Sequence, residues 1–424
     1  MDYKEFLSSH NLGAEYVDSN GILELFFSEM KKGLNGEESS LRMIATYQES
    51  PDTIVKGEPV IVMDAGGTNF RTVLVTFTDD NKPILEDFRR VPMPGVDRTV
   101  TAKEFYSIFA DNIERFMGKS NRIGFCFSYA AEITEDHDGI PLMFSKEIKA
   151  PETIGRPLGK EILGELKRRG YDVDNVKISI VNDTVATLLA ANAESTTAGA
   201  SFVGFILGTG TNTAYVEKNN NIGKIKRNDG SQIINTESGC LKIELTDLDR
   251  AFMLTTQDPN SYHLEKMISG AYLGSFSYFV IKKAIEEGVF SPLFVSSFSS
   301  LSMLKTEDIG SFISSGEGVL GSLEKNREDS LSLYFILEAI IERAGKLTAI
   351  NLSAAALSSS GGETVDNPIV INADGTTFYK LPYLKFYTTY YLEEILKKNN
   401  KRFYKIVNID SSPIIGAAIS ALAL

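Results

Sequence analysis

Apolar positions along this chain follow two different periods, and their alternation predicts an α/β fold. Short apolar runs of strand length end on small or polar residues, while longer segments repeat an apolar residue every three or four positions. Strands are predicted over residues 60–78 (a hairpin), 122–129, 176–181, 202–207, 213–217, 369–373 and 404–409. Helices are predicted over most of 1–50, from 102 onward, and over 157–169, 184–194, 264–287 (one helix or two), 331–357, 384–397 and 415–424. Alternating strands and helices place binding sites at strand ends.

The segments between these elements show how the chain is divided. Residues 132–149 are polar and too long for a tight hairpin, which favours a functional loop. Residues 292–302 are predicted to be a loop with local helix, and residues 358–368 a loop. At 424 residues the chain is too long to form a single hydrophobic core, yet no linker divides it cleanly. We therefore expect two domains with discontinuous boundaries.

The stretch from Val60 to Val75 carries the clearest chemical pattern. It reads VIVMDAGGTNFRTVLV, in which two apolar runs flank a polar, glycine-containing connection, as in a hairpin. Glycines without a Cβ let backbone N–H groups approach an anion. Thr68 and Arg71 add donors, and Asp64 could hold a hydrated Mg²⁺ against the same phosphates. An ordinary β-turn with polar side chains is the alternative, and it would be the better interpretation of an isolated GGT.

The same pattern recurs in the second half of the chain. The apolar run 202–207 leads into Gly208-Thr209-Gly210-Thr211-Asn212, and a return strand follows. The triplet Gly210-Thr211-Asn212 corresponds to Gly67-Thr68-Asn69 of the first hairpin. Two matched strand–turn–strand copies indicate a duplicated α/β fold with two phosphate-facing hairpins across one cleft. Chance similarity between two short hairpins is the alternative.

Composition and charge exclude several classes of partner. Hydrophobic residues make up 43% of the chain and charged residues 23%, as in folded soluble proteins. The net charge of −13 argues against a nucleic-acid surface or an anionic membrane as partner. Two cysteines cannot form a disulfide framework, and three histidines share no metal-ligand spacing. With no apolar segment near the N-terminus and no apolar run approaching ~18 residues, a cytoplasmic protein is expected.

Polar residues at strand ends supply the remaining candidate chemistry. They are Asp64, Asn182-Asp183, Asn212, Asn235 to Glu237, and Glu265. Each alone is more often a cap or turn residue, and Asp183 could be the N-cap of the helix that follows it. Taken together, amides and carboxylates without metal-ligand spacing suit hydrogen bonding to a polyhydroxylated ligand. One carboxylate could then accept a hydroxyl proton.

At these motifs the sequence resembles the hexokinase family, within the actin/Hsp70/sugar-kinase superfamily. The resemblance runs nearly the full chain through SLRMIATY, VMDAGGTNFR, GFCFSYAAEIT, FSKEIKAP, VNDTVATLLA, LGTGTNTAYVE and HLEKMISGAYLG, in that order. It implies a two-domain, duplicated actin-like ATPase (ribonuclease H-like) fold with an interdomain active-site cleft. The small domain would comprise residues 58–185 plus 405–424, and the large domain residues 1–57 plus 186–404.

The resemblance also implies roles for individual residues. Asp183 would be the general base for the 6-hydroxyl of a hexose, with Lys146 and Arg71 also catalytic. Sugar hydroxyls would be bound by Ser128, Ser145, Lys146, Asn182, Asp183, Asn212, Glu237 and Glu265. ATP would be bound by Asp64, Gly66, Gly67, Thr68, Asn69, Arg71, Gly208, Thr209, Gly210, Asp374, Gly375, Thr376, Ser411, Ser412 and Gly416. Asp64 would hold Mg²⁺ through water.

The sequence departs from the family pattern at several positions. Ala130 replaces a proline, Ser145 a threonine, and Tyr262 a glutamine contact. Ser238 stands where the family has a tryptophan, and Asp410-Ser411-Ser412-Pro413 replaces the final glycine-containing turn. These changes bear on sugar specificity and nucleotide contacts, and none removes a charged catalytic group.

Two other functions stay open beside an ATP-dependent hexokinase. One is an enzyme of the same fold that acts on another acceptor or hydrolyses ATP, which the amides and carboxylates suited to vicinal hydroxyls disfavour. The other is a non-catalytic sugar sensor, which has no need of Asp64, Arg71, Lys146 and Asp183 together. The expected partners are a hexose and ATP, with the protein a monomer or homodimer. The sequence does not distinguish among hexoses.

Overall fold

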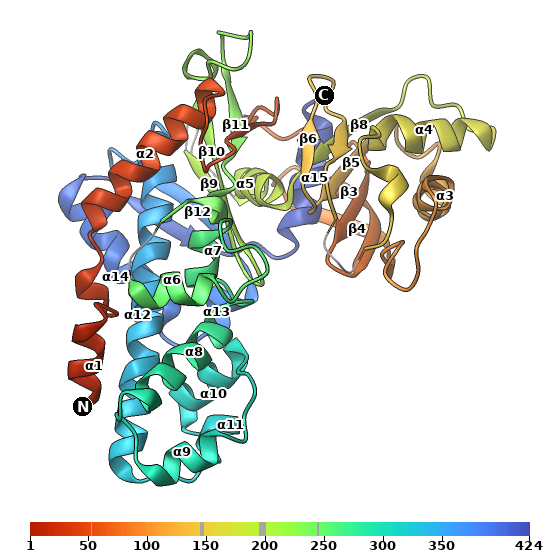
Figure 1. Cartoon of the computed structure of the whole chain (residues 1–424). Coiled ribbons are helices and arrows are strands. Elements are labelled where there is room, and N and C mark those ends of the chain that lie inside the picture. The colour runs from red at the N-terminus through yellow and green to blue at the C-terminus, as the bar shows by residue number, and fades with distance from the viewer. Residues whose placement is uncertain (52, 145–147, 195–200, 244–245) are drawn as a thin grey trace.

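The computed structural model describes residues 1–51, 53–144, 148–194, 201–243 and 246–424, which form two lobes, each built on a sheet (Figure 1). The strands are β1 Ile44–Ala45, β2 Val60–Gly66, β3 Asn69–Phe77, β4 Pro83–Pro92, β5 Arg122–Phe127, β6 Ala131–Ile133, β7 Gly139–Pro141, β8 Lys177–Val181, β9 Phe202–Leu207, β10 Thr211–Lys218, β11 Ser231–Asn235, β12 Ile369–Asp374 and β13 Tyr404–Val407. One sheet has the order β4-β3-β2-β5-β8, the other β1-β11-β10-β9-β12-β13, and β6 pairs with β7.

The two main sheets share one topology. In the first, β2, β3 and β4 are antiparallel neighbours, while β5 and β8 run parallel to β2. In the second, β9, β10 and β11 are antiparallel neighbours, while β12 and β13 run parallel to β9. Each sheet therefore contains three antiparallel strands followed by two parallel ones, and the short β1 adds a further antiparallel strand at the edge of the second sheet. This repeated order confirms the duplicated α/β fold that the two glycine-containing hairpins predicted.

Helices cover both sheets and fill most of the larger lobe. They are α1 Tyr3–Ser9, α2 Ser19–Asn35, α3 Ala102–Ile113, α4 Leu158–Arg168, α5 Asp183–Glu194, α6 Asp247–Met253, α7 His263–Ile268, α8 Leu273–Glu286, α9 Pro292–Phe298, α10 Thr306–Ser315, α11 Gly318–Gly321, α12 Arg327–Ser358, α13 Thr376–Lys380, α14 Leu384–Leu392 and α15 Ser412–Leu422. The 32-residue α12 runs through the larger lobe and is buried along most of its length. Among the helices described, none is long and apolar enough to cross a membrane.

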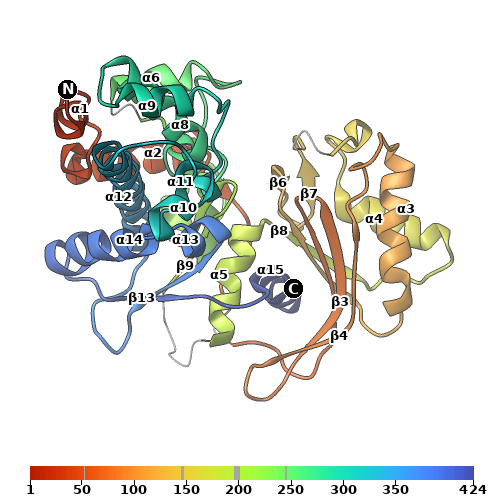
Figure 2. The same ribbon diagram turned by 90° about the horizontal axis from the view of Figure 1, so that it is seen from below.

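Two helices, α5 and α15, lie between the sheets and pack against each other (Figure 2). Helix α15 covers the five-stranded sheet and α5 covers the six-stranded sheet. A Cβ on Gly416 of α15 would lie 1.9 Å from the carbonyl oxygen of Ala186 on α5. Likewise, a Cβ on Gly124 would lie 2.0 Å from the carbonyl oxygen of Ala417. Helix α15 therefore packs on α5 of the other lobe, and on β5 of its own, through backbones that only glycine allows to approach so closely.

Some elements differ from the sequence predictions. Strand β4 was not predicted because its residues are almost all exposed, so it lacks the alternation of a half-buried strand. Strand β11 was not predicted either. The first part of residues 132–149, expected to be a loop, forms the β6–β7 hairpin instead. Residues 292–298, expected to be mainly loop, form α9, whose first turn is capped by Ser291.

The packing of Gly416 leads to a stability prediction. Alanine is usually the better helix former by about 1 kcal/mol, so Gly416→Ala would stabilise an unhindered helix. Because its methyl group would overlap the Ala186 carbonyl group, we expect it to destabilise the protein by about 1–3 kcal/mol. Thermal and urea unfolding would measure the change. Gly164→Ala on α4 is the matched control, since nothing lies within 4 Å of its added Cβ. Equal or higher stability of Gly416→Ala would contradict the prediction.

Candidate active site

The first predicted phosphate loop is a two-residue turn between β2 and β3. Gly66 pairs with Asn69, which leaves Gly67 and Thr68 at the exposed tip. Gly67 has a φ of +57°, a conformation that favours glycine. The Tyr129 hydroxyl group donates a hydrogen bond of 2.6 Å to the Gly67 carbonyl oxygen. The Tyr129 hydroxyl group therefore fixes the turn, while the tip of the turn stays accessible to a ligand.

Asp64 and Arg71 lie opposite each other just below this turn. They are directly paired across β2 and β3, and the guanidinium group of Arg71 forms an ion pair with the Asp64 carboxylate. Asp64 is 2% exposed, and burial raises its pKa, while the Arg71 charge and a hydrogen bond from Cys126 oppose that rise. In the described part of the chain, no three metal-ligating side chains gather into a cluster. A single carboxylate at a strand end nevertheless fits Mg²⁺, which usually keeps several waters and binds phosphates as well.

The second predicted phosphate loop, residues 208–210, lies against two other loops. The backbone N–H groups of Gly270 and Ala271 donate to the carbonyl oxygens of Gly208 (2.8 Å) and Thr209 (3.1 Å). Gly375 has a φ of +116°, and a Cβ there would lie 2.3 Å from the carbonyl oxygen of Leu207. Only glycine fits this position. The loop after β12 is thereby held close against the second hairpin.

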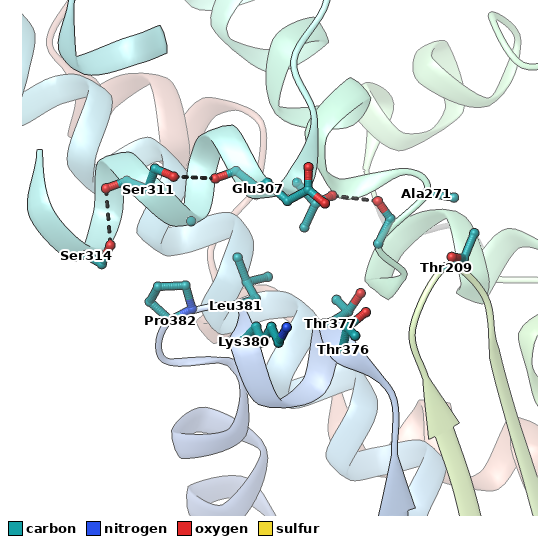
Figure 3. A pocket seen from close by; sticks show the side chains of 13 residues that line it. Thr209, Ala271, Glu307, Ser311, Ser314, Thr376, Thr377, Lys380, Leu381 and Pro382 are labelled. Atoms are coloured by element: carbon teal, nitrogen blue, oxygen red, sulfur yellow. Dashed lines mark hydrogen bonds between the residues drawn. The ribbon is translucent and has the colours of Figure 1, made fainter. Parts of the chain in front are cut away.

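A pocket of about 530 Å³ opens beside this loop junction (Figure 3). It is lined by Thr209, Gly270, Ala271, Thr306, Glu307, Gly310, Ser311, Ser314, Thr376, Thr377, Lys380, Leu381 and Pro382. The sequence predicted Thr209 and Thr376 here. It missed the side of the pocket built from α10 and the chain around Lys380, because their polar residues match the surface of any exposed helix. The lining combines one cation (Lys380), one carboxylate (Glu307), several hydroxyl groups and an apolar wall at Leu381 and Pro382.

Asn212, Asn235 and Glu237 form one hydrogen-bonded group at the ends of β10 and β11. The Asn212 side-chain amide donates to Asn235 Oδ1 (2.7 Å) and to Glu237 Oε1 (3.2 Å), and the Asn235 amide donates to Glu237 Oε1 (2.9 Å). Glu237 has a φ of +56°, a strained conformation for a residue other than glycine. All three belong to the polar strand-end residues that the sequence singled out, although the roles implied by the family resemblance did not include Asn235.

Glu265 faces the second phosphate loop. Its carboxylate accepts a hydrogen bond of 3.0 Å from the backbone N–H of Thr211, and a Cβ on Gly210 would lie 2.6 Å from Glu265 Oε2. Burial raises the pKa of Glu265, the Thr211 N–H opposes the rise, and the charge of Glu237 adds to it. The carboxylate is thus held against the loop by backbone contacts.

Asp183 begins α5 directly after β8. Its carboxylate and the side-chain oxygen of Asn182 both accept from the backbone N–H of Thr184, at 2.8 and 2.9 Å. Burial raises the pKa of Asp183 to about 7, with the charges of Glu237 and Asp64 adding to the rise. Hydrogen bonds from Thr184 and Ser128 oppose it. A carboxyl group with a pKa near neutrality can accept a proton from a ligand hydroxyl group.

Other predicted residues lie elsewhere or outside the described ranges. Ser412 and Gly416 are buried at the start of α15, where the Ser412 hydroxyl donates to the Ile409 carbonyl oxygen (2.7 Å). They serve helix packing and do not line the pocket, while Ser411 precedes α15 with a φ of +59°. Ser145 and Lys146 fall outside the described residues. Ser238, which replaces the family tryptophan, is buried and accepts a hydrogen bond from Asn351 (3.3 Å).

The chain matches two family models, both described as hexokinase, over residues 3–193 and 202–423. Hexokinase-5 of Oryza sativa subsp. japonica is 27% identical over 375 residues, covering 81% of this chain and 73% of that one. Hexokinase-1 of Mus musculus is 28% identical over 390 residues, covering 84% of this chain but only 38% of the relative.

Solved structures agree with this assignment at the level of the fold. A hexokinase from Schistosoma mansoni complexed with glucose has a TM-score of 0.76 and 21% identity, covering 100% of this chain and 99% of that one. A second hexokinase structure has a TM-score of 0.77 and 19% identity, covering 96% and 94% of the two chains. With two hexokinase models that together span almost its whole length, this chain belongs to the hexokinase family, phosphotransferases that act on a hexose hydroxyl group.

Proposed function

We propose that this protein transfers the γ-phosphoryl group of ATP to the 6-hydroxyl of glucose or a related hexose, with Asp183 as the general base. The observation that carries the proposal is the placement of a carboxyl group with a pKa of about 7 at the end of β8, electrostatically coupled to Asp64 and Glu237. In the transfer, the hydroxyl oxygen bonds to the γ-phosphorus, its proton passes to Asp183, and the bond to the β-phosphate oxygen breaks. ADP and a hexose 6-phosphate are the products.

Sugar hydroxyl groups would be bound by side chains from both lobes. Ser128 and Asn182 directly follow β5 and β8 of the five-stranded sheet. Asn212 and Asn235 lie on β10 and β11 of the six-stranded sheet, and Glu237 follows β11. Together they offer both donors and acceptors, which a vicinal diol requires. Glu265, and by family resemblance Ser145 and Lys146, would complete the set. Because the groups come from two lobes, a bound sugar would favour lobe closure and exclusion of water.

The nucleotide would lie across the second phosphate loop. Its adenosine would occupy the pocket beside Thr209 and Thr376, where Leu381 and Pro382 supply an apolar wall. Its phosphates would meet the backbone N–H groups of both glycine-containing turns. Asp64 would hold Mg²⁺ through water, and the ion would neutralise charge on the transferred group. Positioning and charge neutralisation supply most of the rate in such transfers.

A coupled ADP-release assay with glucose, mannose, fructose, galactose and N-acetylglucosamine tests the proposal. We expect ATP- and Mg²⁺-dependent ADP release that requires one or more of these sugars. Release of ADP without sugar would identify an ATP hydrolase. Sugar binding by calorimetry with no ADP release from any of the five would overturn the proposal in favour of a sensor.

Replacement of Asp183 by asparagine separates a catalytic base from a helix cap. Asp183→Asn keeps the size and hydrogen-bonding capacity of the side chain but cannot accept a proton. We expect kcat to fall by about 10²–10⁴-fold, the usual contribution of a general base. Sugar affinity measured by calorimetry should change by less than about 1.5 kcal/mol.

Asp18→Asn is the matched control for this variant. Asp18 caps α2 by accepting from the Asn20 N–H at 3.1 Å, and asparagine caps about as well as aspartate. We expect its kcat to equal that of the parent. If Asp183→Asn also retained kcat within about threefold, far below the general-base range, Asp183 would be only a cap.

The raised pKa of Asp183 predicts the pH dependence of catalysis. A base works in its deprotonated form, so kcat/KM for the sugar should fall as pH drops through about 7 and level off above it. An aspartate with an ordinary pKa near 4 would give a flat profile between about pH 6 and 8. Initial rates at saturating ATP, with circular dichroism to exclude unfolding, measure the profile. A flat acid limb over this interval would contradict the raised pKa.

A further inference from the structure

Three charged side chains form a row across the five-stranded sheet below the first phosphate turn. Asp64 on β2 lies directly opposite Arg71 on β3, and Arg71 lies directly opposite Arg90 on β4. Directly opposed residues of antiparallel strands point to the same face, with Cβ atoms about 4.5–5.5 Å apart. The side chains of Val62 and Val73 on this same face pack toward α15, so the row faces the space between the lobes.

Arg90 differs from Arg71 in having no carboxylate partner. Arg71 forms an ion pair with Asp64, whereas Arg90 is exposed and, in the described part of the chain, forms no ion pair. Among the described residues, its side chain donates from Nε to the side-chain oxygen of Asn69, at 2.8 Å. Asn69 closes the phosphate turn next to Thr68. The bond therefore holds the Arg90 guanidinium group at the turn while leaving its two terminal nitrogens free to donate.

The charge of Arg71 is compensated by Asp64, so Arg90 gives the row one uncompensated positive charge beside a second guanidinium group. An anion beside the two arginines would compensate that charge, and a guanidinium group offers two parallel donors that match phosphate oxygens. A polyphosphate at the adjacent turn is the anion that the surroundings favour.

We propose that Arg90 is a second phosphate-binding arginine, which contacts the terminal phosphates of the nucleotide donor beside Arg71. This inference rests on the proposed function, because it assumes that the β2–β3 turn meets those phosphates. Arg90 adds affinity for the phosphate chain, with no part in recognition of the sugar or the adenine.

The neighbouring Arg89 provides a matched control. It lies opposite Thr72, on the other face of the sheet, and forms an ion pair with Asp87 at 3.4 Å. Arg89→Ala therefore removes the same charge from the same strand without removing a group from the interlobe face. Because long-range electrostatics change equally in both variants, a difference between them reports contact with the phosphates.

The experiment compares steady-state kinetics of the full chain and the variants Arg90→Ala, Arg89→Ala and Arg90→Lys. We expect Arg90→Ala to raise the KM for ATP about tenfold, the low end for a hydrogen bond to a charged group, with the KM for sugar unchanged. Arg90→Lys should recover part of the loss, because it keeps the charge but not the paired donors. Inorganic tripolyphosphate, as a competitor of ATP, should inhibit the parent more strongly than Arg90→Ala.

The melting temperature without nucleotide distinguishes phosphate binding by Arg90 from a structural role, because a structural role predicts that Arg90→Ala lowers it. Without nucleotide, Arg90→Ala should be at least as stable as the parent, because Arg90 is exposed and places an uncompensated positive charge opposite Arg71. A lower melting temperature with both KM values raised together would assign Arg90 a structural role and overturn the inference. Equal KM values for ATP in Arg90→Ala and Arg89→Ala would overturn it too. If the parent itself shows no sugar-dependent ADP release, the proposed function is wrong. That outcome is distinct from an active parent whose Arg90→Ala variant keeps its KM for ATP, which refutes only the role of Arg90.

Discussion

The close crossing of α5 and α15 is the constraint on which the rest of the structure depends. Gly416 and Ala186 bring the two helix backbones into contact, and each helix then covers one sheet. The buried Asn372 side chain donates to the Thr187 carbonyl oxygen (2.8 Å) and the Ser412 hydroxyl (3.0 Å), so β12, α5 and α15 are tied at one point. The helix crossing is built from small residues, which lets the two helices approach closely between the sheets.

The segment between β1 and β2, which passes from the six-stranded to the five-stranded sheet, is held in this same region. The Gln48 carbonyl oxygen accepts from the Ile233 N–H of the six-stranded sheet at 2.8 Å. Its side-chain oxygen accepts from the Ser420 hydroxyl of α15 at 2.8 Å. One buried residue therefore contacts both lobes, next to the helices that separate the sheets. This segment is one of the places where the chain passes from one sheet to the other, and hinges are often built at such positions.

Burial controls the electrostatics of the site. Asp64, Asp183 and Glu265 are all desolvated, and burial raises the pKa of each. What distinguishes them is the compensating group: Arg71 for Asp64, and backbone N–H groups for Asp183 and Glu265. The Arg71 charge favours the ionised form of Asp64, the form that a cation beside phosphates requires. The same residue type can therefore serve as metal partner, proton acceptor or hydrogen-bond acceptor according to its surroundings.

The sequence by itself determined the duplicated fold and most of the polar strand ends. Apolar runs that end on Gly-Thr-Asn specify their structure locally, because the glycines allow the tight turns and the apolar side chains favour buried strands. Asp183 and Glu265 stood out for the same local reason, as polar groups directly after buried segments or at the start of helices. Only the tertiary structure decided where α10 and the chain around Lys380 meet, because nothing local distinguishes a pocket wall from an exposed surface. The tertiary structure also decided that Gly416 serves a helix crossing. It placed Arg90, on a strand without apolar alternation, opposite Arg71. Both arrangements depend on contacts between elements, which no local sequence pattern specifies.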